Sequence, residues 1–73
     1  MMPILRRAAL LRAERFAAKA VQNIRDARAL EQKGAAAAAR TRRNAFLVNR
    51  DEAAHWLERS GEAGLAETCR RAK

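Results

Sequence analysis

Two stretches of the chain, ARALEQKGAAAAARTRRNA at residues 27–45 and AHWLERSGEAGLAETCRRA at residues 54–72, decide the fold. Aligned at an offset of 27 residues, they are identical at nine of nineteen positions. The identical pairs are Ala27/Ala54, Leu30/Leu57, Glu31/Glu58, Gly34/Gly61, Ala36/Ala63, Ala39/Ala66, Thr41/Thr68, Arg43/Arg70 and Ala45/Ala72. A Leu-Glu pair followed by glycine is typical of a helix end, and small residues after it let a second helix pack closely. The repeat therefore predicts helical hairpins that turn at Gly34 and Gly61.

The sequence before Gly34 predicts one long, basic, amphipathic helix over residues 1–33. Pro3 suits the first turn of a helix, and no further glycine or proline follows until Gly34. Apolar residues recur at steps of three and four, which is the helical period. This apolar stripe consists of Ala9, Ala13, Phe16, Ala17, Ala20, Ile24 and Ala27.

The sequence predicts a second helical segment over residues 34–60 and a short C-terminal helix over residues 61–73. The second stripe consists of Ala35, Ala38, Ala39, Ala45, Phe46, Ala53, Trp56 and Leu57. Asn49 followed by Glu52 resembles a capping box, so the sequence leaves open whether the second segment breaks near Asn49. We predict that the main buried side chains, either within one chain or across a dimer, are Phe16, Ile24, Phe46, Trp56 and Leu57.

The composition predicts a single small all-α domain over residues 1–73, with three to four helices. The β-branched residues are few and never adjacent, which argues against strands. The single cysteine, Cys69, excludes an internal disulfide, and together with His55 it is too little for a zinc site. Ser60 is the only serine, and no set of nucleophile, base and orienting group can be assembled. We therefore expect no enzyme activity, no metal and no cofactor.

The charge of the chain is strongly positive and unevenly distributed. The formal net charge is +8, with residues 1–50 carrying +9 and residues 51–73 carrying −1. Thirteen of the sixteen basic residues are arginine, which favours forked contacts with phosphates and carboxylates. This asymmetry predicts a nucleic acid, an acidic protein surface or an anionic membrane surface as partner. No apolar run reaches the roughly 20 residues that a membrane span needs.

Two sets of side chains are candidates for partner contact. Electrostatic contact with nucleic acid or an acidic partner is assigned to Arg12, Arg15, Lys19, Arg40 and Arg43. The first three are expected opposite the apolar stripe of their helix, and antiparallel packing about Gly34 would bring both basic sets toward a common edge. Leu47 and Val48 point away from the second stripe and are candidates for an apolar partner contact. The alternatives are a solvated basic helix face and two isolated surface apolar residues.

The pattern around Gly34 resembles two known helical families. Its Leu-x-x-x-Gly turn is similar to that of tetratricopeptide hairpins, and it also resembles the ANR and PerC-type small bacterial transcription regulators. The matching positions are Ala27, Leu30, Glu31, Gly34, Ala38, Ala39 and Ala45. Arg42 departs from the regulator pattern, which usually has tryptophan there. The resemblance implies a bacterial regulator that acts through protein contacts, and it assigns no contact residue.

Two main classes of function follow from the sequence. The first is a small basic helical regulator that binds nucleic acid or a regulatory protein. The second is a protein-binding adaptor or inhibitor of the phage or plasmid type, and a structural subunit of a large assembly is a further alternative. A protein partner and a homodimer are both compatible with the exposed apolar residues. The expected location is the cytoplasm of a bacterium or a phage host, with an organelle as the alternative because residues 1–28 have transit-peptide composition.

Overall fold

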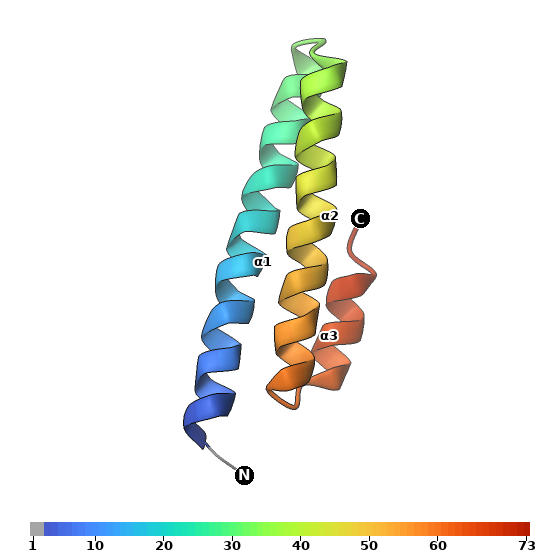
Figure 1. Ribbon diagram of the computed structural model, residues 1–73. Helices are drawn as coiled ribbons and strands as arrows, with labels where there is room; N and C mark the ends of the chain where they lie inside the picture. The colour runs from blue at the N-terminus through green and yellow to red at the C-terminus, as the bar shows by residue number, and fades with distance from the viewer. Residues whose placement is uncertain (1–2) are drawn as a thin grey trace.

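The computed structural model describes residues 3–73 and confirms the all-α fold class. Within that range the chain forms three helices and no strand: α1 (Pro3–Gln32), α2 (Ala36–Arg59) and α3 (Ala63–Arg70) (Figure 1). Met1 and Met2, which the predicted 1–33 segment included, lie outside the described residues. The long first helix follows from its composition, because alanine and arginine are strong helix formers and Pro3 occupies its first position.

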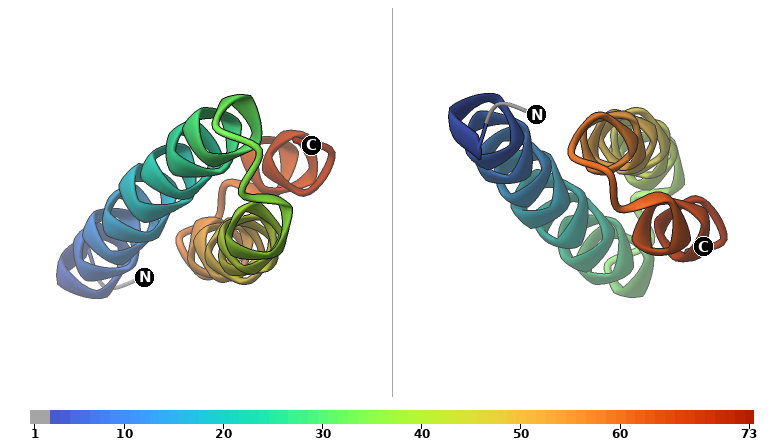
Figure 2. Two further views of the ribbon diagram at one scale, coloured as in Figure 1. Left: turned by 90° about the horizontal axis from the view of Figure 1, so that it is seen from above. Right: turned by 90° about the horizontal axis from the view of Figure 1, so that it is seen from below.

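The helices form an elongated body measuring 50 × 19 × 12 Å. α1 and α2 run antiparallel, and α3 turns back along the second half of α2 and packs against α2 alone (Figure 1). The end views show α1 inclined to α2, with α3 beside α2 (Figure 2). α2 is therefore the central helix, with one neighbour on each of two sides.

The two connections between helices share one hydrogen-bond pattern. Gly34 has φ +77° and Gly61 has φ +89°, the left-handed conformation that glycine adopts without steric cost. The amide of Ala35 donates to the Leu30 carbonyl, and the amide of Glu62 donates to the Leu57 carbonyl, each at 2.9 Å. Both are bonds across a Schellman-type helix end, which satisfies carbonyls that the helix leaves unpaired.

Side chains repeat at the same offset of 27 residues. Arg43 pairs with Glu31 across the first connection, and Arg70 pairs with Glu58 across the second. Thr41 and Thr68 each donate to the carbonyl four residues earlier. The hydrogen bond from Arg70 holds the pKa of the Glu58 carboxyl below its ordinary value and raises the pKa of Arg70. The internal repeat of the sequence is thus a repeat of structure.

The core consists almost entirely of alanine, which corrects the predicted list of buried side chains. Phe46 is buried at 8% exposure, whereas Phe16, Ile24, Trp56 and Leu57 are only half-buried. Apart from Phe46, the buried apolar residues are Ala9, Ala13, Ala20, Ala27, Ala39, Ala53, Ala54 and Ala66. Small residues let the helix backbones approach closely, so most positions of the interface, Phe46 excepted, leave no room for a large side chain. The larger side chains are therefore displaced to the edges of the interface.

α2 continues through Asn49 without a break, so the capping-box interpretation of Asn49 and Glu52 is wrong. The Asn49 side chain does not cap a helix; its amide nitrogen donates to Oδ1 of Asn23 on α1 at 2.7 Å. A cross-helix partner satisfies the amide, and the alanine-rich sequence on both sides favours the helix. The Asn23–Asn49 pair also fixes the register of α1 against α2, because a shifted alignment would leave a part-buried amide unpaired.

Two glycine substitutions are expected to have opposite effects on stability. Gly34→Ala should lower the free energy of unfolding by about 1 kcal/mol, because alanine is strained at positive φ even though its Cβ would meet nothing within 4 Å. Gly64→Ala should raise it by about 0.5–1 kcal/mol, because Gly64 is helical and equally unobstructed. Urea unfolding of both variants measures the difference, and equal signs would contradict the assigned turn geometry.

Candidate nucleic-acid interface

Arg12, Arg15 and Lys19 line a groove along one edge of the α1–α2 interface. The groove holds a hollow of about 400 Å³, whose other lining residues are Phe16, Glu52 and Trp56. The three basic residues follow one another at helical spacing, so their side chains emerge on one side of α1. They do not lie opposite the apolar stripe, as the sequence suggested, but at its margin. At about 100° per residue, Arg12 and Lys19 lie roughly a quarter-turn from the centre of the stripe, so the helical spacing itself places them at its margin.

Arg12, Lys19 and Arg59 place their cationic groups over aromatic rings of this groove. The guanidinium carbon of Arg12 is 4.7 Å from the centroid of the Trp56 ring, and Nζ of Lys19 is 5.3 Å from the centroid of Phe16. Arg59, from the end of α2, places its guanidinium carbon 5.9 Å from the Trp56 ring. These contacts hold flexible basic side chains over half-buried aromatic groups. The groove therefore combines positive charge with flat apolar surface.

The positive charge of the groove is not neutralised by ion pairs. Among residues 5–73 the ion pairs are Arg6–Glu62, Arg43–Glu31, Arg50–Asp51, Arg70–Glu58 and Arg71–Glu67, and none involves Arg12, Arg15 or Lys19. Glu52 is the one acidic residue that lines the hollow, against three basic ones. Since exposed cations attract anions over about a Debye length, the groove is a positive surface available to a partner.

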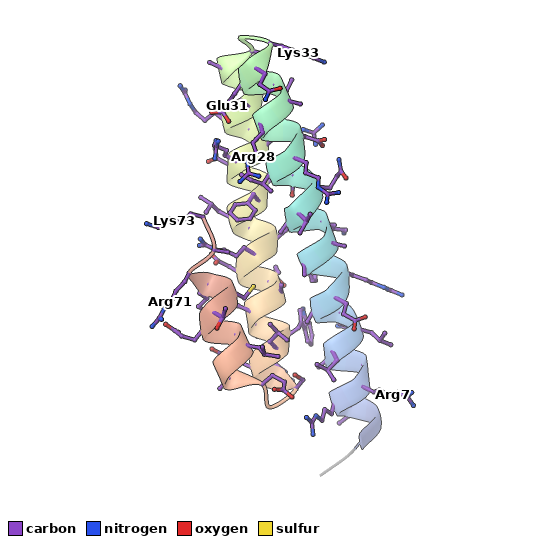
Figure 3. The ribbon with its side chains drawn as sticks, turned by 180° about the vertical axis from the view of Figure 1, so that it is seen from behind. Arg7, Arg28, Glu31, Lys33, Arg71 and Lys73 are labelled. Atoms are coloured by element: carbon purple, nitrogen blue, oxygen red, sulfur yellow. The ribbon has the colours of Figure 1, made fainter. Side chains whose placement is uncertain are left out.

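Arg40 and Arg43 do not join this groove, so the expected common basic edge does not form. Trp56 and Arg43 are separated by roughly 20 Å along α2, at about 1.5 Å per residue. The Arg43 guanidinium is also engaged by Glu31, which projects from α1 together with Arg28 on the face that carries α3 (Figure 3). Arg40 is exposed one turn before Arg43. The two predicted basic sets thus remain separate surfaces.

Leu47 and Val48 are both exposed, at 42% and 64%, but they do not form one surface. Leu47 lines a hollow of about 230 Å³ together with Arg43, Phe46, Arg50 and Lys73, and Val48 is not among its lining residues. Successive residues of a helix point about 100° apart, so neighbours in sequence rarely share a contact. Leu47 is the member of the pair that belongs to a shaped surface.

Sequence reasoning assigned Trp56 and Phe16 to the core and did not single out Arg59. In the structure all three take part in the basic groove. A signal was present in the composition, because alanine-rich helix faces approach closely and leave little room between them for a tryptophan. An antiparallel alignment of the two stripes about Gly34 would also have placed Trp56 near Arg12.

Comparison of the chain with family models, curated proteins and solved structures gives no match. Among residues 3–73, no group of three or more histidine, cysteine, aspartate or glutamate side chains is placed to hold a metal ion. No helix within the same residues has the length and apolar character to cross a membrane. Functional assignment therefore rests on the groove itself.

Proposed function

We propose that the protein is a small, non-enzymatic regulator that acts by binding nucleic acid through the groove lined by Arg12, Arg15 and Lys19. The observation that carries this proposal is a row of three cations, free of ion pairs among the described residues, beside the rings of Phe16 and Trp56. The regulatory role rests on the resemblance of residues 27–45 to bacterial transcription regulators. That resemblance implies protein contacts, so nucleic acid is proposed as the partner from the groove alone. The non-enzymatic character rests on the missing set of catalytic side chains.

The chemistry of the groove suits a polyphosphate backbone. A row of cations on one helix face can contact successive phosphates and release the counterions condensed on them. Arginine adds forked hydrogen bonds to phosphate oxygens, and the aromatic rings offer contact to sugars or bases. A purely acidic protein surface would use the cations but would leave the aromatic part of the groove without a matching group.

The test of this proposal is the salt dependence of binding to a labelled oligonucleotide. Three phosphate contacts predict that affinity for duplex DNA falls roughly 40-fold between about 50 and 200 mM monovalent salt. Fluorescence anisotropy at several salt concentrations measures the slope of log K against log salt. Affinity that does not change with salt, or no binding at the lowest salt, would refute the proposal.

The hollow beside Leu47 favours a second candidate, a protein-binding adaptor. Its lining combines the apolar Phe46 and Leu47 with Lys73, which suits an apolar side chain flanked by an acidic residue on a partner. Arg43 and Arg50 also line the hollow, but they are already paired with Glu31 and Asp51. This surface lies apart from the basic groove, so the two candidate functions can be tested with separate variants.

Leu47→Asp and Val48→Asp form a matched pair for the adaptor candidate. If a protein binds in the hollow, Leu47→Asp should weaken recovery of that nuclease-resistant partner at least tenfold, because a carboxylate would be buried in an apolar contact. Val48→Asp should leave recovery unchanged, since Val48 does not line the hollow. Quantitative pull-down from the native host after nuclease treatment measures both. Equal effects of the two variants would show that a protein partner does not bind in this hollow.

We also propose a cellular location and an oligomeric state for the protein. The family resemblance of residues 27–45 supports a bacterial or phage-encoded protein of the cytoplasm. A homodimer is proposed as a further property, because Leu5 and Leu11 on α1 are more than half exposed. Sedimentation equilibrium at two protein concentrations distinguishes the monomer from the dimer.

A further inference from the structure

Trp56 stands between two hollows of the same groove. The hollow of about 400 Å³ lies on one side, and a second of about 310 Å³ lies toward the N-terminal end of α1. Arg12 and Trp56 line both hollows, whereas Leu5 and Arg59 line only the second. The Arg12–Trp56 pair therefore forms a ridge with a cavity on each side.

The indole of Trp56 already has flat groups packed against it. Two guanidinium groups, from Arg12 and Arg59, lie within 6 Å of its ring centroid, at 4.7 and 5.9 Å. A guanidinium is planar and delocalised, as a nucleobase is, so a base can occupy the same position on the ring. Both arginine side chains are long, and on displacement each can follow the phosphate that accompanies the base.

From this geometry, and resting on the proposed function, we infer that the groove binds single-stranded nucleic acid with an unpaired base stacked on Trp56. Arg15 and Lys19 take the phosphates on one side of that base, and Arg59 takes a phosphate on the other. The hollow on each side of the ridge gives room for the neighbouring nucleotides. Alternating cations and aromatic rings are the arrangement by which proteins bind single strands without reading their sequence.

A duplex fits this groove less well. Its bases are paired and stacked inside the helix, so their faces cannot reach a ring that is half-buried between two protein helices. A duplex can approach the exposed cations, but it leaves Trp56 unused. The groove therefore allows two distinct modes of binding. Any polyanion can contact the exposed cations through its backbone, whereas only an unpaired base can contact the ring of Trp56.

Trp56 is the only tryptophan of the chain, so its fluorescence reports this contact directly. The full chain is titrated at low salt with oligo(dT), with an abasic deoxyribose-phosphate strand of equal length, and with duplex DNA. We expect oligo(dT) to quench the indole and to bind about tenfold more tightly than the abasic strand, since one stacked base contributes roughly that factor. The abasic strand and the duplex should bind without quenching.

Two substitutions extend the test. Trp56→Leu should lose about tenfold in affinity for oligo(dT) and keep its affinity for duplex, while Trp56→Phe should retain most of the oligo(dT) affinity because a ring remains. Circular dichroism checks that both variants stay helical. If either variant fails to fold, the quenching of Trp56 fluorescence in the unaltered protein still tests the stacking inference. Equal, unquenched binding of all three nucleic acids would overturn the stacking inference and leave the proposed function standing. Failure of every nucleic acid to bind would overturn both.

Discussion

Replacing Phe46 with alanine should lower the free energy of unfolding by about 3 kcal/mol or more. Among residues 5–73, Phe46 is the only large side chain that is buried, at 8% exposure, and the other buried apolar residues are alanine. The substitution removes the buried ring and leaves a space that the alanines of the core cannot fill, although Leu47, Arg43 and Arg50 beside the surface hollow can reach part of it. A domain of this size has a total stability of roughly 4–11 kcal/mol, and the loss is therefore a large part of it. Thermal unfolding followed by circular dichroism measures the change.

Val48→Ala is the matched control for Phe46→Ala, because Val48 lies on the same helix at 64% exposure. Its effect should stay within about 0.5 kcal/mol, the usual range for surface substitutions. If the two variants melt at the same temperature, Phe46 does not hold α2 in place, and the assignment of the core is wrong.

Reversing two charges in the groove, Arg15→Glu together with Lys19→Glu, should weaken binding of nucleic acid about 100-fold at low salt. Each lost charge-assisted contact is worth about 1.5 kcal/mol, or about tenfold, and the new carboxylates repel phosphate. The slope of log affinity against log salt should also fall by about two units. The pair leaves Arg12 and its contact with Trp56 in place, so the aromatic part of the groove is retained.

The control for this variant is Arg25→Glu together with Arg28→Glu on the same helix. It changes the net charge by the same amount, and Arg28 lies on the face that carries α3 rather than in the groove (Figure 3). We expect less than a fivefold effect, from the general field of the protein alone. Equal losses in the two double variants would mean that net charge, not the groove, attracts the nucleic acid.

The sequence predicted the helices well because their signals are local. The lack of β-branched runs, the helical period of the apolar residues and the proline at the start of α1 each act within a few turns. Residues 27–45 and 54–72 carried the same turn signal twice, and the structure has the same hydrogen bonds at both places. Where the predicted boundaries fall within the described residues, they differ from the observed ones by one to three residues, since helix ends depend on the detailed cap.

The placement of large side chains was less accessible from sequence, because it depends on the distance between helices. A stripe pattern shows which face is apolar, but it does not show how close two such faces approach. Here alanine brings α1 and α2 together, and Trp56 and Phe16 are displaced to the edge. The same limit explains Asn49, whose cross-helix partner Asn23 lies 26 residues earlier in the chain.

The candidate site was predicted in part. Arg12, Arg15 and Lys19 were named together from their spacing on one helix, and they line one groove. Arg40 and Arg43 were joined to them on charge and on the expected antiparallel packing about Gly34, although Arg43 is held by Glu31 and lies far along α2. Ion pairs between helices depend on how the helices are aligned. The number of basic residues in a sequence therefore overestimates the number of cations that are free to contact a partner. For the same reason Arg40→Glu with Arg43→Glu is a poor probe, since it places a glutamate beside Glu31.

The adjacent residues Ala53 and Ala54 are both fully buried, which is possible only because α2 is covered on two sides. A substitution in α2 must therefore be compatible with packing against two neighbouring helices. A substitution in α1 or α3 must be compatible with packing against one. We therefore expect α2 to tolerate fewer substitutions than α1 or α3 during evolution. A chain without α3 would expose one side of α2 as a new surface, while the contact between α1 and α2 would remain.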